Sequence, residues 1–189
     1  MSETKTKYKL GLQLPTDPRW ANMAEISLEE ILTDHAFCEQ KATTSCISLI
    51  QKYPKHTRLV NKLSPVVTEE WGHFRLVIAE MEKRGMQLGE QRNDEYVVAL
   101  RKFQKKDGSR ETALIDALLA FALIEARSCE RFRLLSLNIS DPKLRDFYHM
   151  FMVSEAGHYR MFLDLAYHYA NDDVFVKNRW QQYLDFEEE

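Results

Sequence analysis

The chain has 189 residues, of which 44% are hydrophobic and 11% aromatic, with only six glycines and five prolines. This size and composition fit one compact domain spanning residues 1–189 and favour an all-α class. The formal net charge of −3 neither demands nor excludes a nucleic-acid partner, while the absence of a long apolar run or a secretory signal predicts a cytoplasmic protein without a membrane segment.

The first half of the chain predicts an arm and two long helices. Residues 1–24 are expected to form an N-terminal arm with a turn at residues 15–18, which contain two prolines. A helix should begin at Ser27, where Ser27 and Glu30 make a capping-box pattern, and run to about residue 53. The next helix should cover residues 57–84, with a kink at Pro65 and an end at Gly85.

The second half repeats this plan after a crossover at residues 86–109, which contains a short helix over residues 94–106. Long helices are predicted for residues 110–138 and 142–171, the latter capped by Asp141 and started by Pro142. Residues 172–189 form a last short helix and an acidic tail. Two helical hairpins joined by a long crossover, with short accessory helices, are typical of a ferritin-like four-helix bundle.

One short phrase occurs twice, as Glu-Trp-Gly-His-Phe-Arg at residues 70–75 and as Glu-Ala-Gly-His-Tyr-Arg at residues 155–160. A carboxylate and an imidazole three positions apart lie on one helical face, so each pair can bind a metal ion. A further glutamate precedes each phrase, by 31 residues in the first half and by 30 in the second. The predicted ligands of a dimetal centre are therefore Glu39, Glu70, His73, Glu125, Glu155 and His158.

Distances along the predicted helices support this ligand set. Each glutamate lies 13 or 14 residues from the turn of its hairpin, which is about 20 Å of helix. All four helices therefore bring a ligand to the same level.

The charges and donor types also suit a buried pair of ions. Two divalent cations balance four glutamates while the histidines bind neutral, so the filled site tolerates burial. Carboxylate-rich ligation with one imidazole per ion favours iron or manganese over zinc. We expect Glu39 and Glu125 to bind terminally and Glu70 and Glu155 to bridge.

Residues near the ligands have structural interpretations. Cys38, Cys46 and Cys129 lack metal-site spacing and are expected to be reduced thiols, with Cys38 and Cys129 buried near the site. His35 lies one turn before Glu39, either as a core histidine or as a partner of that carboxylate. Apolar residues at helical spacing from the ligands predict a wall formed by Val66, Val77, Phe121, Phe151 and Phe162.

Oxygen chemistry is the natural use of a carboxylate-bridged diiron pair, because the pair can give O2 two electrons. The ligands alone do not choose the substrate, since iron-oxidising ferritins, manganese catalases, radical-generating reductase subunits and monooxygenases share them. The sequence contains no flavin, haem or iron–sulfur motif, so an oxygenase of this kind needs an external electron donor.

Four segments resemble the bacterial tRNA hydroxylase family MiaE, namely residues 34–39, 69–74, 124–132 and 154–159. The resemblance covers nearly the whole chain. It implies a nonheme diiron monooxygenase that hydroxylates the isopentenyl group of 2-methylthio-N6-isopentenyl-adenosine beside the anticodon of tRNA. It also implies two iron ions at the six ligand positions named above, O2 as co-substrate, a redox partner (a reductase or small electron carrier), and a monomer or small oligomer.

A tRNA substrate should meet basic side chains, because phosphate contacts dominate such binding. The predicted tRNA-binding residues lie on the crossover helix and just beyond it: Arg101, Lys102, Lys105, Lys106 and Arg110. A second basic group lies at the turn between the first two long helices: Lys52, Lys55, Arg58 and Lys62. Such charge runs are equally typical of solvated helix faces.

The alternative function is that of a ferritin-like or rubrerythrin-like protein that oxidises iron or handles peroxide without an organic substrate. This alternative predicts a large symmetric shell or a peroxidase activity. A hydroxylase instead predicts O2 consumption coupled to oxidation of the prenylated adenosine.

Overall fold

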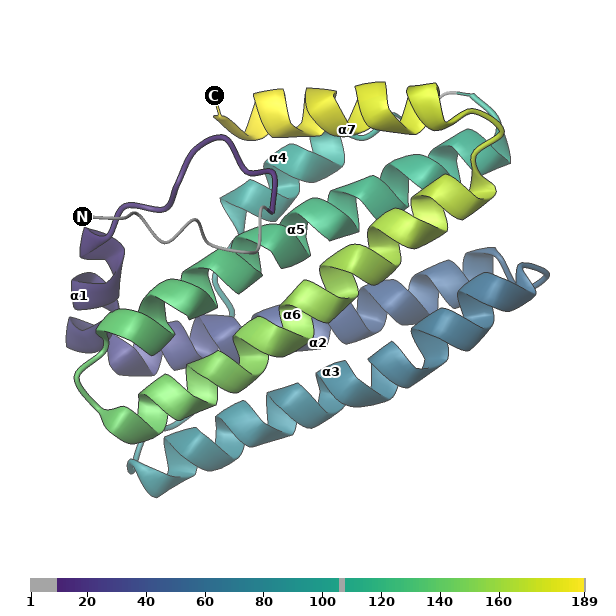
Figure 1. Ribbon diagram of the computed structural model, residues 1–189. Helices are drawn as coiled ribbons and strands as arrows, with labels where there is room; N and C mark the ends of the chain where they lie inside the picture. Colours follow the sequence, from purple (N-terminus) through teal and green to yellow (C-terminus); the bar gives the residue numbers. More distant parts are fainter. Residues whose placement is uncertain (1–9, 106–107, 189) are drawn as a thin grey trace. The chain divides into compact units, whose positions relative to one another are not determined.

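The computed structural model describes residues 10–105 and 108–188, and all regular structure in those ranges is helical (Figure 1). The all-α class predicted from the sequence is confirmed. The chain forms two compact units, one of residues 19–95 and the other of residues 96–189 together with the segment before Arg19. Within the described ranges, no helix has the length and apolar character that a membrane span requires.

The unit of residues 19–95 contains α1 (Arg19–Ile26), α2 (Leu28–Lys52) and α3 (Thr57–Lys83). Helices α2 and α3 pack against each other as an antiparallel hairpin (Figure 1). Helix α3 continues through Pro65 and ends before Gly85, whose φ of +69° favours glycine. The buried side chains of this hairpin include Leu32, Ala36, Leu49, Leu59, Leu63, Val66, Val77 and Met81.

Helix α1 differs from the prediction, because it lies largely inside the segment of residues 1–24 that was expected to be an arm. Asp17 and Pro18 precede it directly, and an Asp-Pro pair is a common helix start. The predicted capping box at Ser27 is also wrong: the Ser27 side chain makes no capping bond, and its amide donates to the Met23 carbonyl at 3.1 Å. The chain therefore passes from α1 into α2 with a single turn residue between them. The predicted arm's first nine residues lie outside the described ranges.

The second unit contains most of α4 (Glu95–Phe103) and all of α5 (Arg110–Asn138), α6 (Pro142–Tyr169) and α7 (Asp173–Glu188). Helices α5 and α6 pack as a second antiparallel hairpin, and α7 packs against both. Ser109 caps α5 by accepting from the Thr112 amide at 3.1 Å. Asp141 caps α6 as predicted, accepting from the Lys143 amide at 2.8 Å.

One buried carboxylate, Asp116 on α5, ties together three segments of this unit. It accepts from Arg179 Nε of α7 at 2.5 Å and from the Tyr183 hydroxyl at 2.9 Å. The Lys105 amide, which follows α4, donates to the same carboxylate at 2.8 Å. The end of the crossover and the last helix are thus both fixed on α5.

Replacement of Arg179 tests this anchor. The change Arg179→Leu should lower the free energy of unfolding by about 3 kcal/mol, because Asp116 would keep a buried charge without its cation. Arg92→Leu is the control, since Arg92 pairs with Glu30 while both side chains are more than half exposed, and its loss should cost about 0.5 kcal/mol or less. Chemical denaturation followed by circular dichroism measures both, and equal losses would contradict the anchor.

Candidate metal centre

Helices α2 and α3 bring together three of the predicted ligands. One oxygen of Glu39, one oxygen of Glu70 and one ring nitrogen of His73 lie within 4.8 Å of one another. His73 Nδ1 is 3.3 Å from Glu70 Oε2 and 3.5 Å from Glu39 Oε2. All three residues are buried, so the first hairpin carries a compact triad of two carboxylates and an imidazole.

The protonation of this triad reflects crowding. Burial raises the pKa of Glu39 well above its ordinary value, and the neighbouring Glu70 carboxylate adds to the effect. Burial alone would lower the pKa of His73, but its hydrogen bonds with Glu39 and Glu70 outweigh this and raise it to about 10. Protonation of this triad thus offsets the mutual repulsion of its buried carboxylates.

Helices α5 and α6 present the matching triad of the second hairpin. One atom from each of Glu125, Glu155 and His158 lies within 4.8 Å of the other two. Their exposed fractions are 6%, 3% and 5%. Each hairpin therefore holds two buried carboxylates and one buried imidazole at ligand spacing.

The observed helix boundaries explain why the triads form. Glu39 lies 13 residues before Lys52, the end of α2, and Glu70 lies 13 residues after Thr57, the start of α3. The second hairpin repeats these spacings, from Glu125 to Asn138 and from Pro142 to Glu155. Both legs of each hairpin measure about 20 Å between turn and carboxylate, so the carboxylates in a hairpin meet at one height.

These donors fit a metal ion. Two carboxylates and an imidazole form an oxygen-rich set that suits iron or manganese. A cation would also remove the mutual repulsion of the two buried carboxylates in each triad. The buried Glu and His groups of this chain are thus able to bind a metal.

The sequence left two roles open for His35, either a core histidine or a partner of the Glu39 carboxylate. The structure supports the second role. His35 Nε2 lies 2.7 Å from Glu39 Oε1, and both residues are buried. Burial, with the nearby His73, lowers the pKa of His35 to about 3. The hydrogen bond between His35 and Glu39 fixes the orientation of the Glu39 side chain.

Residues of the predicted apolar wall are present in each hairpin. The predicted burial is correct for one of the two cysteines near the site and wrong for the other. Val66 and Val77 are buried on α3, while Phe151 and Phe162 are buried on α6. Phe121 packs edge-on against Phe162, with ring centroids 5.5 Å apart. Cys129 is buried as predicted, but Cys38 is exposed, because one residue before Glu39 is about 100° around the helix from the buried face.

The sequence analysis missed an ion-pair network beside the second triad. Arg127, two residues after Glu125, is buried and pairs with Glu130 and with Glu187 of α7. The Arg127 side chain also donates to the Leu14 carbonyl at 2.9 Å and to the Thr16 hydroxyl at 3.0 Å. No local spacing could reveal this network, because its partners lie up to 113 residues apart.

The predicted tRNA-binding residues lie at the surface. Arg101 and Lys102 are exposed in the last turn of α4, Lys105 follows that helix, and Arg110 begins α5. Lys106 lies outside the described residues. The second basic group, at the turn between α2 and α3, is also exposed: Lys52, Lys55, Arg58 and Lys62.

Comparison with known proteins gives concordant results. Residues 3–189 match the family tRNA-(MS2IO6A)-hydroxylase (MiaE). A tRNA 2-(methylsulfanyl)-N(6)-isopentenyladenosine(37) hydroxylase from Pseudomonas putida is 38% identical over 85% of this chain and 77% of its own length. A protein of the same name from Salmonella typhimurium is 26% identical over 89% of this chain and 80% of its own length.

A solved structure supports the fold class. Protein 43 with aldehyde deformylating oxygenase activity from Synechococcus has a TM-score of 0.88 and 31% identity, covering 93% of this chain and 86% of that one. The predicted ferritin-like class is confirmed, and the named relatives make the chain an enzyme of the hydroxylase type. The chain belongs to the MiaE family of tRNA hydroxylases.

Proposed function

We propose that this protein is an O2-dependent diiron monooxygenase that hydroxylates the isopentenyl group of 2-methylthio-N6-isopentenyl-adenosine at position 37 of tRNA. The proposed substrate is supported by family membership over nearly the full length of the chain. The proposed metal-dependent oxygen chemistry is supported by the duplicated triads of buried carboxylates and imidazoles. No other feature of the described residues offers comparable redox chemistry.

The two triads are proposed to serve one pair of iron ions. Glu39 and Glu125 would bind terminally, Glu70 and Glu155 would bridge, and His73 and His158 would complete one ion each. Two ferrous ions held by these residues would supply the electrons for O2 activation, so that one oxygen atom enters a C–H bond and the other leaves as water. The equal spacings in the two hairpins and the matching donor sets support this assignment.

The protein's own residues prepare and protect the site. His35 holds one oxygen of Glu39 at 2.7 Å and leaves the other oxygen for a metal. Buried apolar side chains on the same helices, among them Val66, Val77 and Phe162, exclude water and can contact an apolar prenyl chain.

Each hydroxylation consumes two electrons from outside the substrate and two protons; with the two electrons of the C–H bond they reduce O2 to one hydroxyl oxygen and one water. An external reductase or small electron carrier is proposed to supply the electrons. We also propose that the enzyme works in the cytoplasm, where it meets tRNA, and that it is a monomer or small oligomer. The comparisons favour this function over iron handling, because both curated relatives carry hydroxylase names.

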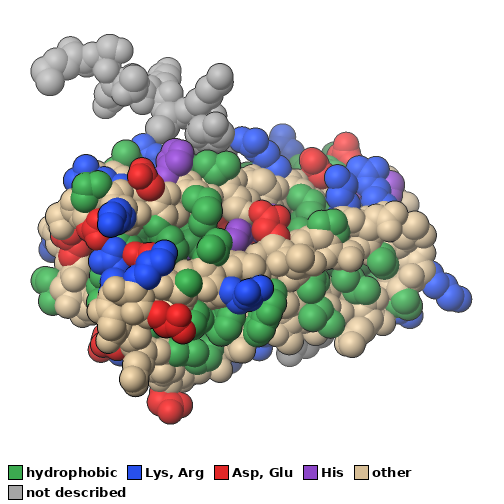
Figure 2. All heavy atoms as spheres, turned by 90° about the horizontal axis from the view of Figure 1, so that it is seen from below, with side chains coloured by type: hydrophobic (Ala, Val, Ile, Leu, Met, Phe, Trp, Pro, Cys, Tyr) green, Lys and Arg blue, Asp and Glu red, His purple; other side chains and the backbone are tan. Residues whose placement is uncertain are grey.

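Binding of tRNA must rely on local positive charge, since the net charge of the chain is −3. On the face shown in Figure 2, basic and acidic side chains are interspersed with hydrophobic ones. Four exposed basic residues lie at the end of α4 and the start of α5: Arg101, Lys102, Lys105 and Arg110. We propose that they contact phosphates, together with Lys106, which lies outside the described residues.

The function is tested by incubating tRNA that carries the prenylated adenosine with iron-loaded protein, reductant and O2. Nucleoside mass analysis should show the gain of one oxygen atom, and omission of iron or O2 should abolish it. Glu70→Ala should lower the rate by about 100-fold or more. Glu82→Ala, an exposed glutamate on the same helix, should leave the rate within twofold, roughly the effect of a surface change. Oxidation of iron without any modified nucleoside would support the iron-handling alternative.

Metal binding is tested independently of activity with two histidines of α6. His158→Ala should weaken ferrous iron binding at one of the two sites by about 100-fold or more, because it removes a ligand. His168→Ala is the control, since His168 is exposed near the end of the same helix. Metal analysis after equilibrium dialysis should give about two ions for the control and about one for His158→Ala; equal contents would reject His158 as a ligand.

Charge reversal tests the tRNA-binding cluster. The triple change at Arg101, Lys102 and Lys105 to Glu should weaken tRNA binding and reduce the slope of log affinity against log salt by about one for each lost phosphate contact. Lys143→Glu combined with Lys177→Glu reverses exposed lysines elsewhere on the same unit and should retain the salt slope. Fluorescence anisotropy with labelled tRNA gives both quantities. An unchanged salt slope in the triple variant would show that these residues do not contact tRNA phosphates.

A further inference from the structure

The part of the first hairpin nearest its turn is strongly basic. Residues 40–68 contain four lysines, one arginine and no aspartate or glutamate, although the whole chain has a net charge of −3. Lys41 pairs with Asp94 at 2.8 Å. The other four cations are exposed around the turn between α2 and α3: Lys52, Lys55, Arg58 and Lys62. This half of the hairpin therefore presents an excess of positive charge.

The matching part of the second hairpin has a mixed charge. Residues 126–153 also contain five lysines and arginines, but they include three acids, Glu130, Asp141 and Asp146. The two hairpins thus carry equal numbers of cations, and the absence of acids distinguishes the first one. A surface with such a local excess of positive charge is suited to a polyanion, and phosphate contacts dominate the binding of nucleic acids.

An exposed aromatic side chain lies on α3 one residue after the proposed ligand Glu70. Trp71 is 46% exposed, and it stacks on Phe74 with ring centroids 4.8 Å apart and planes inclined by 18°. The two other tryptophans, Trp20 and Trp180, are partly buried. The stacking contact limits the rotation of the Trp71 ring while much of the ring stays open to solvent, which gives a preformed aromatic surface.

The neighbours of Trp71 on the surface of α3 are small or basic. Ser64 and Thr68 on the preceding turns and Arg75 on the next turn lie within about 60° of it around the helix, and all three are exposed. Glu69, the first acid along α3, points about 160° away from Trp71. An indole ring, two hydroxyl groups and a guanidinium group thus share one exposed strip of α3.

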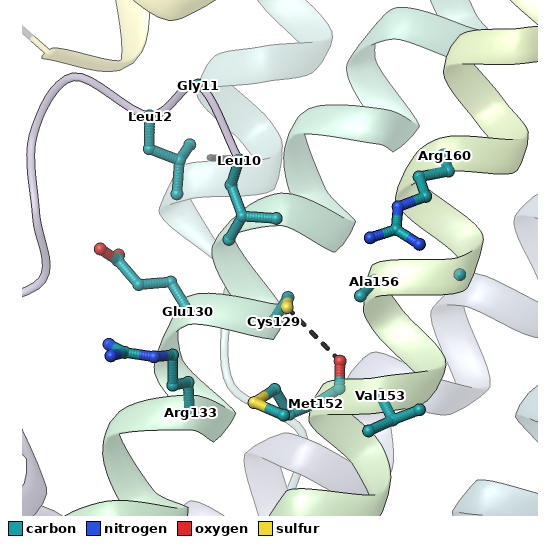
Figure 3. Close-up of a pocket in the computed structure, with 11 residues that line it drawn as sticks. Leu10, Gly11, Leu12, Cys129, Glu130, Arg133, Met152, Val153, Ala156 and Arg160 are labelled. Atoms are coloured by element: carbon teal, nitrogen blue, oxygen red, sulfur yellow. Dashed lines mark hydrogen bonds between the residues drawn. The ribbon is translucent and has the colours of Figure 1, made fainter. Parts of the chain in front are cut away.

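The internal repeat uses the corresponding positions of the second hairpin differently. Trp71 corresponds to Ala156, and Phe74 corresponds to Tyr159. Ala156 lines a cavity of about 580 Å3 between α5 and α6, which residues 10–12 cover as a roof (Figure 3). The Tyr159 hydroxyl donates to the Leu10 carbonyl at 3.1 Å, so this aromatic residue holds a segment of its own chain. The aromatic pair of the first hairpin instead faces solvent.

The two equivalent arginines differ in the same way. Arg160 lines the roofed cavity together with Glu130, whose carboxylate pairs with Arg127. Arg75 lines an open hollow of about 500 Å3, together with the exposed Glu69, and all residues around this hollow come from α3. Both Arg75 and the neighbouring indole are therefore accessible to a large partner.

We propose that the turn half of the first hairpin binds the anticodon arm of the tRNA substrate, with phosphates on the four exposed cations around the turn and an unpaired loop base stacked on Trp71. This assignment rests on the proposed function and names a surface by which the enzyme recognises the RNA. Proteins recognise single-stranded loops chiefly by stacking their bases on aromatic side chains. A duplex offers no such base, so Trp71 selects a loop while the basic turn provides affinity.

The base stacked on Trp71 is a neighbour of the modified nucleotide. Around α3, Trp71 points about 100° away from Glu70, so a base on the indole does not face the metal ligands. It anchors the loop one residue from Glu70 along the helix, and the modified nucleotide beside it carries the prenyl group. From Thr57, at the turn, to Trp71 the helix rises about 20 Å, which several nucleotides of the arm can span.

Replacement of the indole tests the stacking contact in full-length, iron-loaded protein. Trp71→Ala should weaken the binding of an anticodon stem-loop RNA about tenfold or more, the effect of losing one stacked base, and Trp71→Phe should recover most of the loss. Leu76→Ala is the control, because Leu76 is also 46% exposed on α3 but lies about 140° from Trp71. Fluorescence anisotropy measures the affinities, and melting curves with iron content verify folding. Equal affinities of Trp71→Ala and Leu76→Ala would overturn the assignment.

Indole fluorescence gives a direct readout of the same contact. Trp20→Phe combined with Trp180→Phe leaves Trp71 as the one tryptophan of the chain. The stem-loop RNA should quench its emission, because a nucleobase stacked on indole accepts its excitation, whereas a blunt duplex of the same stem should not, since its bases are paired and stacked internally. Quenching by both RNAs, or by neither, would contradict a stacked loop base.

Charge reversal tests the basic turn. Lys55→Glu combined with Lys62→Glu should reduce the slope of log affinity for the stem-loop against log salt by about two, one for each lost phosphate contact. Lys143→Glu combined with Lys177→Glu makes the same change in net charge at exposed positions of the second unit and should retain the slope. Equal slopes in the two double variants would remove the basic turn from the proposal.

The outcomes separate this inference from the proposed function, because binding of the stem-loop requires no hydroxylation. If the protein binds the stem-loop through Trp71 but leaves prenylated tRNA unmodified in the presence of iron, reductant and O2, the proposed function fails and the RNA-binding surface stands. If hydroxylation proceeds and Trp71→Ala retains both KM and RNA affinity, only the surface is overturned. Loss of a dimer in Trp71→Ala with unchanged RNA affinity, seen by size-exclusion chromatography, would also overturn it and assign the indole to a contact between two copies.

Discussion

Burial of carboxylates is the constraint on which the rest of this structure depends. Each hairpin places two glutamates and one histidine on the face that in an ordinary helical hairpin carries only apolar side chains. Such groups are costly to bury unless a counter-charge accompanies them, and the raised pKa of Glu39 expresses that cost. A bound cation removes it. The same constraint explains the contact from His35, whose pKa is lowered to about 3 by burial, so that it adds a hydrogen bond to Glu39 but no counter-charge.

The second unit shows how the chain treats buried carboxylates that have a purely structural role. Asp116 faces Arg179, and Glu187 faces Arg127, so each of these carboxylates has a guanidinium within the protein. In the first hairpin, Glu39 and Glu70 instead share a histidine. Arginine cannot give up its proton, whereas histidine can exchange its proton for a metal. The choice of partner therefore distinguishes the two kinds of buried acid.

The long helices were predictable because proline, glycine and capping residues mark their ends. The boundaries of α5 matched the prediction, and Asp141 with Pro142 fixed the start of α6. The two triads of candidate ligands were predictable because helical spacing alone brings the carboxylates to one height. Helix α1 was not predictable, since two prolines at residues 15–18 indicate a turn as readily as a helix start. The Arg127 network was not either, because Thr16 and Glu187 reach it through tertiary folding.

The internal repeat shows which residues the two halves of the chain share and how the surroundings of those residues differ. Both contain Glu, Gly, His and Arg at the same spacing, and this common part supplies four of the six proposed metal ligands. They differ in the surroundings of the arginine. Arg75 shares its hollow with an exposed acid, whereas Arg160 lies in a roofed cavity whose acid is paired with Arg127.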